Sequence, residues 1–192
     1  MTMLNAVGAA VVAASLITQS PQTITKTTES IVQIKATVGE NTMLCTGFVV
    51  GISWVITAKH CIPEGTQDVM VDERASKVLK VNEAFALLEV PPLKYPILNL
   101  RKDRPKVGEA VTSLGYPYGF PLMAFKRNVA AFCECGFAKG DHLIMDNRIG
   151  MGMSGGPVID ESGKVVGLNQ AGVETISIAC TAQEIKEFLD GK

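Results

Sequence analysis

Gly150-Met151-Gly152-Met153-Ser154-Gly155-Gly156-Pro157-Val158 decides the fold and the candidate chemistry of this chain. The glycines permit backbone angles that other residues rarely adopt. They let the amide N–H groups of Gly152 and Ser154 face a common point, where an oxyanion would form if the Ser154 hydroxyl attacked a carbonyl group. The alternative is a glycine-rich turn without chemistry, and the rest of the sequence separates the two interpretations.

Length and composition indicate one globular unit built from short strands. The chain has 192 residues, of which 47% are hydrophobic and 19% charged, and its formal net charge is −1. This size allows one domain or a two-lobed domain with a sizeable core. The lysines and arginines form no basic run, so we expect no nucleic-acid partner. Many glycines and short β-branched runs favour strands joined by turns.

Alternating and fully apolar segments predict about a dozen strands and one terminal helix, which together indicate an all-β fold of two packed barrels. The predicted strands cover residues 30–38, 45–50, 53–57, 69–71, 77–81, 85–90, 110–114, 126–132, 142–145, 157–160, 165–170 and 176–178. Residues 183–189 have helical spacing. We expect a domain over residues 31–192, with barrel 1 at about 31–100, barrel 2 at about 105–182 and a helix at about 182–190.

The N-terminal segment, residues 1–30, differs from the rest in composition. Residues 1–25 contain no charged side chain, and Leu4 to Ile17 is almost entirely apolar. That run is shorter than the roughly 20 residues of a membrane span. It is similar to the hydrophobic region of a secretory signal but lacks a positive start. A targeting signal, a buried helix, and membrane or assembly contact through residues 3–17 all stay open.

A histidine block supplies the second motif. Val55-Ile56-Thr57-Ala58-Lys59-His60-Cys61 places His60 at the end of a hydrophobic strand, where a general base would be held rigidly. An isolated histidine is more often structural than catalytic. Here it precedes Ser154 in the chain, Cys61 follows it directly, and Cys45 lies across one predicted hairpin.

These blocks together resemble the chymotrypsin-like (trypsin-like) serine peptidases over residues 31–192. The stretch CTGFVV…WVITAKHC is similar to that family's histidine block with its local disulfide, and GMGMSGGPV to its serine block. The stretch GYPYGFPL is similar to the bacterial and viral branch that includes the HtrA-type peptidases. The resemblance implies two six-stranded Greek-key barrels and a serine endopeptidase that needs no metal or organic cofactor.

The resemblance also assigns roles to individual residues. Ser154 becomes the nucleophile and His60 the general base, with the Gly152 and Ser154 amides as the oxyanion hole. Gln170, Ala171 and Gly172 would bind a protein or peptide substrate as an added strand. A Cys45–Cys61 disulfide would point to a secreted, periplasmic or otherwise oxidising location, and two buried thiols are the alternative.

The position expected to hold the third catalytic residue, an aspartate, is Ala84. Four explanations stay open: an introduced Asp-to-Ala change, a natural pseudopeptidase that binds peptides without cutting them, replacement by Glu83 through a β-bulge, or a different acid. The last would be Asp68 or Asp72. The position that usually helps to hold the acid carries Gln170, whose amide oxygen is a candidate acceptor for the His60 Nδ1–H group.

The remaining candidates stay less defined. Asp146 would select a basic substrate residue and Arg148 an acidic one, and neither is chosen. With five cysteines, no CxxC pair and two histidines, the sequence argues against a zinc site. His142 has no motif around it and is expected at the surface. The other three cysteines either form one disulfide plus one free thiol or stay reduced: Cys133, Cys135 and Cys180. A silent peptide-binding module and a structural component of an assembly are the rival functions.

Overall fold

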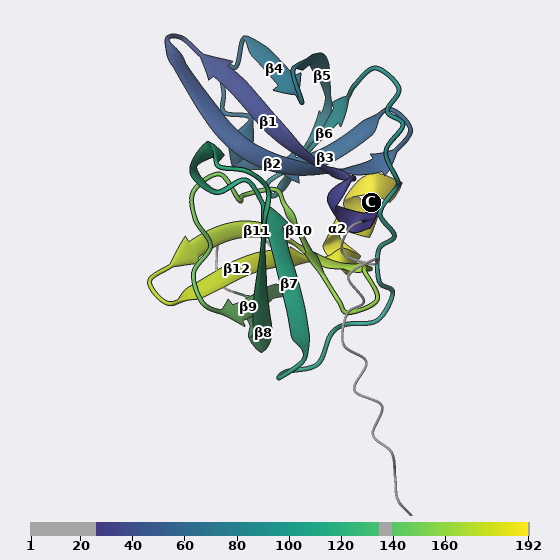
Figure 1. The fold of residues 1–192 in the computed structure, drawn as a ribbon, viewed down its shortest axis with the longest axis vertical. Coiled ribbons are helices and arrows are strands. Elements are labelled where there is room, and N and C mark those ends of the chain that lie inside the picture. Colours follow the sequence, from purple (N-terminus) through teal and green to yellow (C-terminus); the bar gives the residue numbers. More distant parts are fainter. Residues whose placement is uncertain (1–25, 135–139, 192) are drawn as a thin grey trace, which may run out of the picture.

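The computed structural model describes residues 26–134 and 140–191, which form two β-barrels and a C-terminal helix (Figure 1). Barrel 1 contains β1 (Ile31–Val38), β2 (Asn41–Gly51), β3 (Trp54–Ala58), β4 (Asp68–Val71), β5 (Arg74–Val81) and β6 (Phe85–Glu89). Barrel 2 contains β7 (Ala110–Gly115), β8 (Met123–Cys133), β9 (His142–Asp146), β10 (Pro157–Ile159), β11 (Val165–Val173) and β12 (Ile176–Thr181). The fold also contains two 3₁₀ turns, η1 (Lys59–Cys61) and η2 (Pro117–Gly119), and helix α2 (Ala182–Asp190).

Both barrels close with the same ring of antiparallel neighbours. Barrel 1 runs β1-β2-β3-β6-β5-β4 and returns to β1, and barrel 2 runs β10-β11-β12-β9-β8-β7 and returns to β10. Each ring is three strands in sequence order joined to three in reverse order, which gives the Greek-key connection. Closure leaves neither sheet with a full unpaired edge strand. The predicted all-β fold of two six-stranded Greek-key barrels is therefore confirmed.

The alternation of side chains explains why these segments close into barrels. In β1, Val32, Ile34 and Ala36 are fully buried while the residues between them are half-buried. A strand's side chains point to opposite faces in turn, so this pattern places one face in a core. One hydrophobic cluster fills barrel 1 and continues to the helix, and a second fills barrel 2.

Helix α2 joins the two barrels. Thr181 and Glu184 form a capping box at its start, and Gly191 ends it with a left-handed φ of 83°. The Phe188 ring packs against Phe85 of β6 with ring centroids 5.4 Å apart, and Lys80 of β5 donates to the Phe188 carbonyl. A helix that follows the last strand of barrel 2 therefore fastens that barrel to barrel 1.

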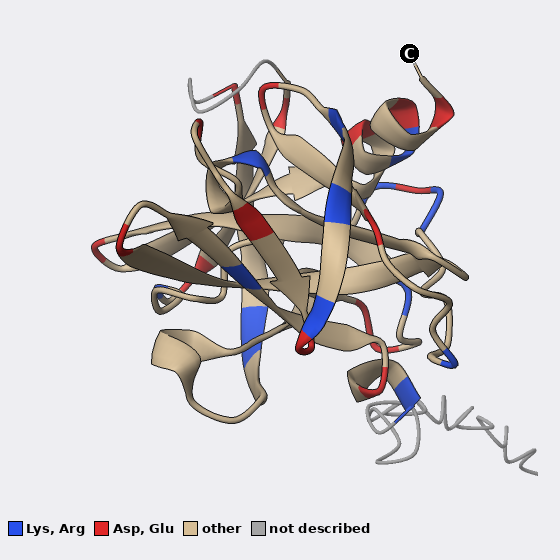
Figure 2. Cartoon of the chain, turned by 90° about the horizontal axis from the view of Figure 1, so that it is seen from above, with Lys and Arg blue, Asp and Glu red and all other residues tan. Residues whose placement is uncertain are grey.

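The predicted strands and the terminal helix all occur, with boundaries that differ by a few residues. The apolar run from Leu4 to Ile17 lies outside the described residues, so its role stays a prediction. No helix in the part of the chain that the structure describes is long and apolar enough to cross a membrane. Figure 2 shows the positions of basic and acidic residues interspersed along the described chain.

Candidate active site

The histidine block lies at the end of β3, against the junction of the two barrels. Strand β3 ends at Ala58, and the η1 turn that follows carries His60 and Cys61. Cys61 forms a disulfide with Cys45 of β2, with their Cα atoms 6.0 Å apart. The predicted pair is therefore present, and it anchors the histidine turn to the neighbouring strand.

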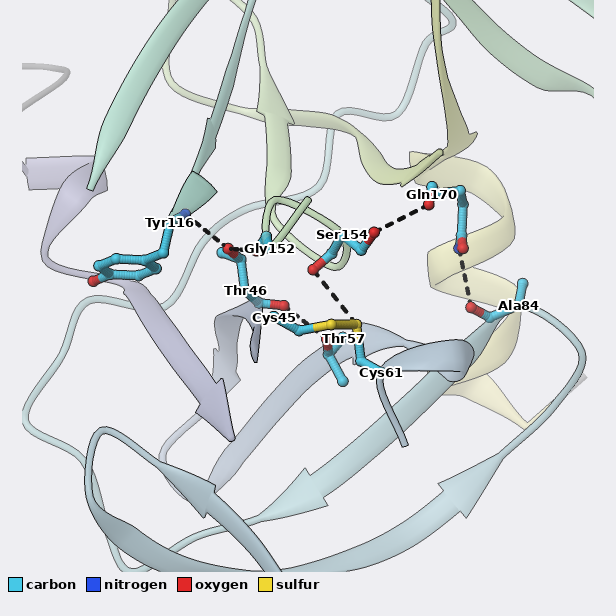
Figure 3. Close-up of a disulfide and its surroundings, with 9 residues drawn as sticks. All are labelled: Cys45, Thr46, Thr57, Cys61, Ala84, Tyr116, Gly152, Ser154 and Gln170. Atoms are coloured by element: carbon cyan, nitrogen blue, oxygen red, sulfur yellow. Dashed lines mark hydrogen bonds between the residues drawn. A yellow bond between two sulfur atoms is a disulfide. The ribbon is translucent and has the colours of Figure 1, made fainter. Parts of the chain in front are cut away.

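The serine loop is held by barrel 1 although it belongs to barrel 2. The backbone N–H of Thr46 donates to the Ser154 carbonyl (2.9 Å), and the Thr46 hydroxyl donates to the Gly152 carbonyl (2.7 Å). The same hydroxyl accepts from the Tyr116 amide (3.0 Å). Cys61 Sγ contacts the Ser154 carbonyl at 3.6 Å; a disulfide sulfur has no hydrogen to donate, so this is a packing contact (Figure 3). These contacts position Ser154 beside the histidine turn.

Two glycines in this loop are required by close approach as well as by backbone angle. Gly152 has a φ of 91° and Gly155 a φ of 84°. A Cβ on Gly152 would collide with the Tyr116 carbonyl oxygen, and one on Gly155 with Thr57 Oγ1 and the Thr46 carbonyl. The glycine pattern of the sequence is thus explained by the packing of the loop between two barrels.

The two amides expected to form the oxyanion hole have their N–H groups unused. Within the described residues, neither the Gly152 nor the Ser154 amide donates a hydrogen bond, whereas the Met153, Gly155 and Gly156 amides all do. Met153, between the two, is fully buried and fixes the turn. Two unpaired donors flank the Ser154 hydroxyl, an arrangement that can accept an anionic oxygen.

The Ser154 hydroxyl donates to the backbone carbonyl of Gln170 (3.2 Å), which places it against β11. The Gln170 side chain does not bond His60, contrary to the sequence-based hypothesis. Its Nε2 donates instead to the Ala84 carbonyl (3.0 Å) and to Cys180 Sγ (3.3 Å). Gln170 therefore ties the start of β6 in barrel 1 to β11 and β12 in barrel 2. Figure 3 shows its bond to the Ala84 carbonyl.

Residue 84 lies beside the histidine turn, but none of the acids considered from the sequence replaces the missing carboxylate. Ala84 is buried, and its carbonyl accepts from the Lys59 amide at 2.8 Å. Its neighbour Glu83 is exposed, and no bulge interrupts β6. Asp72 accepts from the Gln33 amide (2.8 Å) and the Tyr95 hydroxyl (3.4 Å), beyond β4 and away from η1.

Asp68 likewise lies in β4, exposed and paired across from Thr37 of β1. Strand β4 has β1 and β5 as its neighbours, so two strands separate it from β3 in the ring. Neither β4 aspartate is therefore placed to orient the histidine.

The surroundings of His60 lower the pKa of its imidazole. Crowding by surrounding protein lowers the pKa of His60, and the nearby positive charge of Lys59 lowers it further. The residue is nevertheless exposed to solvent. A neutral imidazole can accept a proton, so the shift favours the base form of His60.

Strand β11 offers an open edge next to the serine. It pairs with β10 only from Val165 to Leu168, while Ala171 and Gly172 pair with β12 alone among the described residues. A register shift at Gln170 marks the point where pairing changes. The other side of this segment can therefore pair with an extended peptide.

A buried arginine that the sequence does not mark holds residues 146–148, the segment that lies against Gly172 of β11. Arg127 of β8 donates to the carbonyls of Asp146 (3.0 Å), Asn147 and Arg148 (3.2 Å). Three consecutive carbonyls thus share one guanidinium, and burial lowers its pKa. Arg148 Cγ lies against Gly172, where an added Cβ would approach it to 2.7 Å. Nothing in the sequence around Arg127 marks this role.

The structure also separates the two charges considered for specificity. The Asp146 carboxylate accepts from the backbone and side-chain nitrogens of Asn128 at 2.8 and 2.9 Å, on the β8 side. Arg148 is exposed beside Gly172 and forms no ion pair within the described residues. Of the two, Arg148 is the charge on the side of the open edge.

Three further residues correct or complete the sequence analysis. His142 is fully buried, not at the surface, because it begins β9 inside barrel 2. Cys133 is disulfide-bonded, whereas Cys180 is free and buried. Cys135 lies outside the described residues.

The sequence of this chain is similar to those of known peptidases. The trypsin-like peptidase domain family matches residues 45–168. A probable periplasmic serine endoprotease DegP-like from Hahella chejuensis is 31% identical over 140 residues, covering 64% of this chain and 28% of that protein. Serine protease HTRA1B of Danio rerio is 28% identical over 152 residues, covering 74% of this chain and 32% of its own length. The chain thus matches less than a third of either relative.

Solved structures show the same fold. The active form of Rv3671c protease from M. tuberculosis superposes with a TM-score of 0.81 at 23% identity, covering 98% of this chain and 93% of that one. The HtrA-type protease AlgW with tripeptide gives a TM-score of 0.77 at 18% identity, covering 88% and 62%. At these identities the likeness concerns the fold alone.

Proposed function

This chain belongs to the trypsin-like peptidase domain family, and we propose that it is a serine endopeptidase in which Ser154 is the nucleophile and His60 the general base. The observation that carries the proposal is the Ser154 loop, where two unused amides flank a hydroxyl beside the histidine turn. The substrate is a protein or peptide, in keeping with the proteases among its relatives.

In this mechanism the Ser154 hydroxyl leaves the Gln170 carbonyl and turns toward His60, which takes its proton as the oxygen attacks the scissile carbonyl. The Gly152 and Ser154 amides donate to the resulting oxyanion. His60 returns the proton to the leaving amine, and an acyl group stays on Ser154 until water hydrolyses it. The substrate lies extended along Gln170, Ala171 and Gly172.

The absence of a carboxylate at Ala84 sets the expected rate. In a complete triad the acid orients the imidazole and stabilises its protonated form, and changing it to the amide costs about 10⁴-fold in kcat. We therefore propose a slow peptidase, whose His60 works without an anionic partner.

A catalytically silent peptide-binding module is the second candidate. The hydrogen bond from Ser154 to the Gln170 carbonyl favours it, because that bond turns the hydroxyl toward β11. The open edge of β11 would serve either function. A structural component of an assembly is the remaining rival, with residues 3–17 as its contact.

A fluorophosphonate probe separates the two main candidates, because only a serine activated by a base reacts with it. We expect slow labelling of the wild-type chain at Ser154 and no labelling of Ser154→Ala. The His60→Ala chain should label more slowly than the wild type. A wild-type chain that labels no faster than His60→Ala would support the silent module. Binding of an extended peptide to Ser154→Ala, measured by calorimetry, tests the β11 edge in either case.

The disulfide supports a proposal on location. The Cys45–Cys61 bond would be reduced in a thiol-rich compartment. Several relatives carry the word periplasmic in their names. We propose an oxidising compartment, which free-thiol counting on the chain purified from its native source would test.

A further inference from the structure

Barrel 2 contains a group of chemically reactive side chains that the proposed mechanism does not use. His142 begins β9, Cys180 lies near the end of β12, and Glu184 lies in the first turn of α2. One ligand atom from each comes within 4.8 Å of the others. Ala179 pairs with Leu143 across β12 and β9, so Cys180 and His142 are the next cross-strand neighbours in that register.

The histidine in this group is buried without any hydrogen-bond partner. His142 has no exposed surface, and neither Nδ1 nor Nε2 has a partner in the described structure. A buried polar group without a partner destabilises the fold, and an imidazole has two such atoms. A ligand that accepts a nitrogen lone pair would remove one of them.

The other two members supply a sulfur and a carboxylate oxygen. Cys180 is the free cysteine of the described chain, and burial together with the nearby Glu184 charge raises the pKa of its thiol to about 12. Glu184 uses Oε2 in the helix cap, accepting from the Thr181 amide (2.7 Å) and hydroxyl (2.8 Å). Its Oε1 takes no hydrogen bond within the described residues. A carboxylate oxygen and a sulfur thus lie within 4.8 Å of an imidazole that has no hydrogen-bond partner among the described residues.

We propose that His142, Cys180 and Glu184 bind a thiophilic divalent cation, with zinc as the best fit. Nitrogen, sulfur and oxygen donors of these types are the usual zinc ligands in proteins. On binding, zinc loses water, the Cys180 S–H proton leaves to solvent and an S–Zn bond forms. The thiolate, the carboxylate and a neutral imidazole then make the buried site neutral overall.

The surroundings fit an occupied site. Ligands about 2.0–2.3 Å from zinc lie about 3.3–3.7 Å from each other, so the three side chains would move together by roughly 1 Å. Gln170 Nε2 already donates to Cys180 Sγ at 3.3 Å and would support the thiolate as an outer hydrogen bond. A surface hollow of about 420 Å³ is lined in part by Gly140 and Glu184, so the carboxylate member of the group borders solvent.

The sequence argues against zinc because it contains no closely spaced pair of ligands. The three residues proposed here come instead from two strands and a helix. The sequence spacing of His142 and Cys180 carries no recognisable signal. The inference is independent of the Ser154 chemistry, so either can fail alone.

The test uses the full chain in a His60→Ala background, which leaves His142 as the one remaining histidine of two. After chelator treatment and zinc addition, we expect one zinc per chain by mass spectrometry, release of about one proton, and a higher melting temperature. Cobalt(II) should produce a thiolate-to-metal absorption band. Cys180→Ser should abolish that band.

Two further variants make the result specific. Glu184→Gln keeps the helix cap, because glutamine also serves in a capping box. It should weaken zinc binding at least as much as the roughly 10- to 100-fold that outer-shell changes cost. The matched control is Ser177→Ala, which removes another buried, unpartnered oxygen from β12 and should leave zinc affinity unchanged.

Zinc binding that is equal in the parent and Cys180→Ser would overturn the proposal, as would cobalt binding without a thiolate band. A parent chain that binds no zinc, with the His142 nitrogens satisfied by water alone, would also overturn it. If Cys180→Ser does not fold, Glu184→Gln against Ser177→Ala decides the question.

Discussion

The substitution Ala84→Asp tests whether this site lacks only its acid. Residue 84 is 8% exposed, and its carbonyl accepts hydrogen bonds from the Lys59 amide and from Gln170. It therefore lies beside the turn that carries His60, at the boundary between the barrels. We expect a carboxylate on this residue to reach the His60 imidazole and to stabilise its positive charge after proton transfer.

The expected magnitude follows from electrostatics and from orientation. Two opposite charges about 5 Å apart at an effective dielectric constant of about 20 attract by about 3 kcal/mol. That energy corresponds to about a 10²-fold increase in rate. Fixing the correct tautomer brings the full effect of the acid in a triad to about 10⁴. We expect kcat/KM to rise by about 10²- to 10⁴-fold, and at least as much when Gln170→Ser makes room for the new side chain.

The assay is the rate of fluorophosphonate labelling and of casein hydrolysis, with Ala84→Asn as the matched neutral control. The pH profile adds a second signature. Because crowding and Lys59 lower the pKa of His60, the wild-type base form should persist below pH 6.5. In Ala84→Asp the acid limb should move to higher pH, because a carboxylate raises the pKa of a neighbouring imidazole. A folded Ala84→Asp chain that reacts no faster than Ala84→Asn would refute the reasoning.

Three further predictions concern the scaffold and the pocket. Gly155→Ala should lower the free energy of unfolding, measured in urea, by about 2–5 kcal/mol, because it adds backbone strain and a collision with barrel 1. The control Gly65→Ala, at a φ of 80° with no atom within 4 Å, should lower it by about 1–2 kcal/mol. Equal losses in the two variants would contradict the packing argument. Replacing Cys45 and Cys61 by serine should lower the free energy of unfolding by about 3 kcal/mol, because the bond closes a 16-residue separation; an unchanged denaturation midpoint would show that the bond adds nothing. Peptide libraries should show a preference for acidic residues before the cleaved bond that Arg148→Glu reverses, and an unchanged profile in that variant would remove Arg148 from the pocket.

Much of the fold could be read from the sequence because barrel strands carry a local signal. Side chains alternate along a strand, so β1 and its neighbours show their buried faces as a pattern of period two. The serine loop could be predicted equally well, since Gly152 and Gly155 have backbone angles that few other residues adopt. The Cys45–Cys61 pair followed from the family resemblance, and the structure contains that bond.

Contacts between distant segments could not be predicted in the same way. Gln170 was expected to meet His60, yet its amide bonds the Ala84 carbonyl and Cys180, because β11 shifts register at that residue. His142 was expected at the surface, yet the closure of barrel 2 buries it. Arg127 gave no local sign that its guanidinium would hold three carbonyls.

The sequence by itself determined the all-β architecture, the Ser154 loop, the histidine block and the alanine where an acid is expected. Each of these features depends on residues that are neighbours along the chain. Only the tertiary structure decided that Thr46 of barrel 1 holds the loop of barrel 2, that Glu83, Asp68 and Asp72 lie where they do not replace the expected acid, and that His142, Cys180 and Glu184 come together. Those outcomes depend on strand register and barrel closure, which bring together residues far apart in the chain.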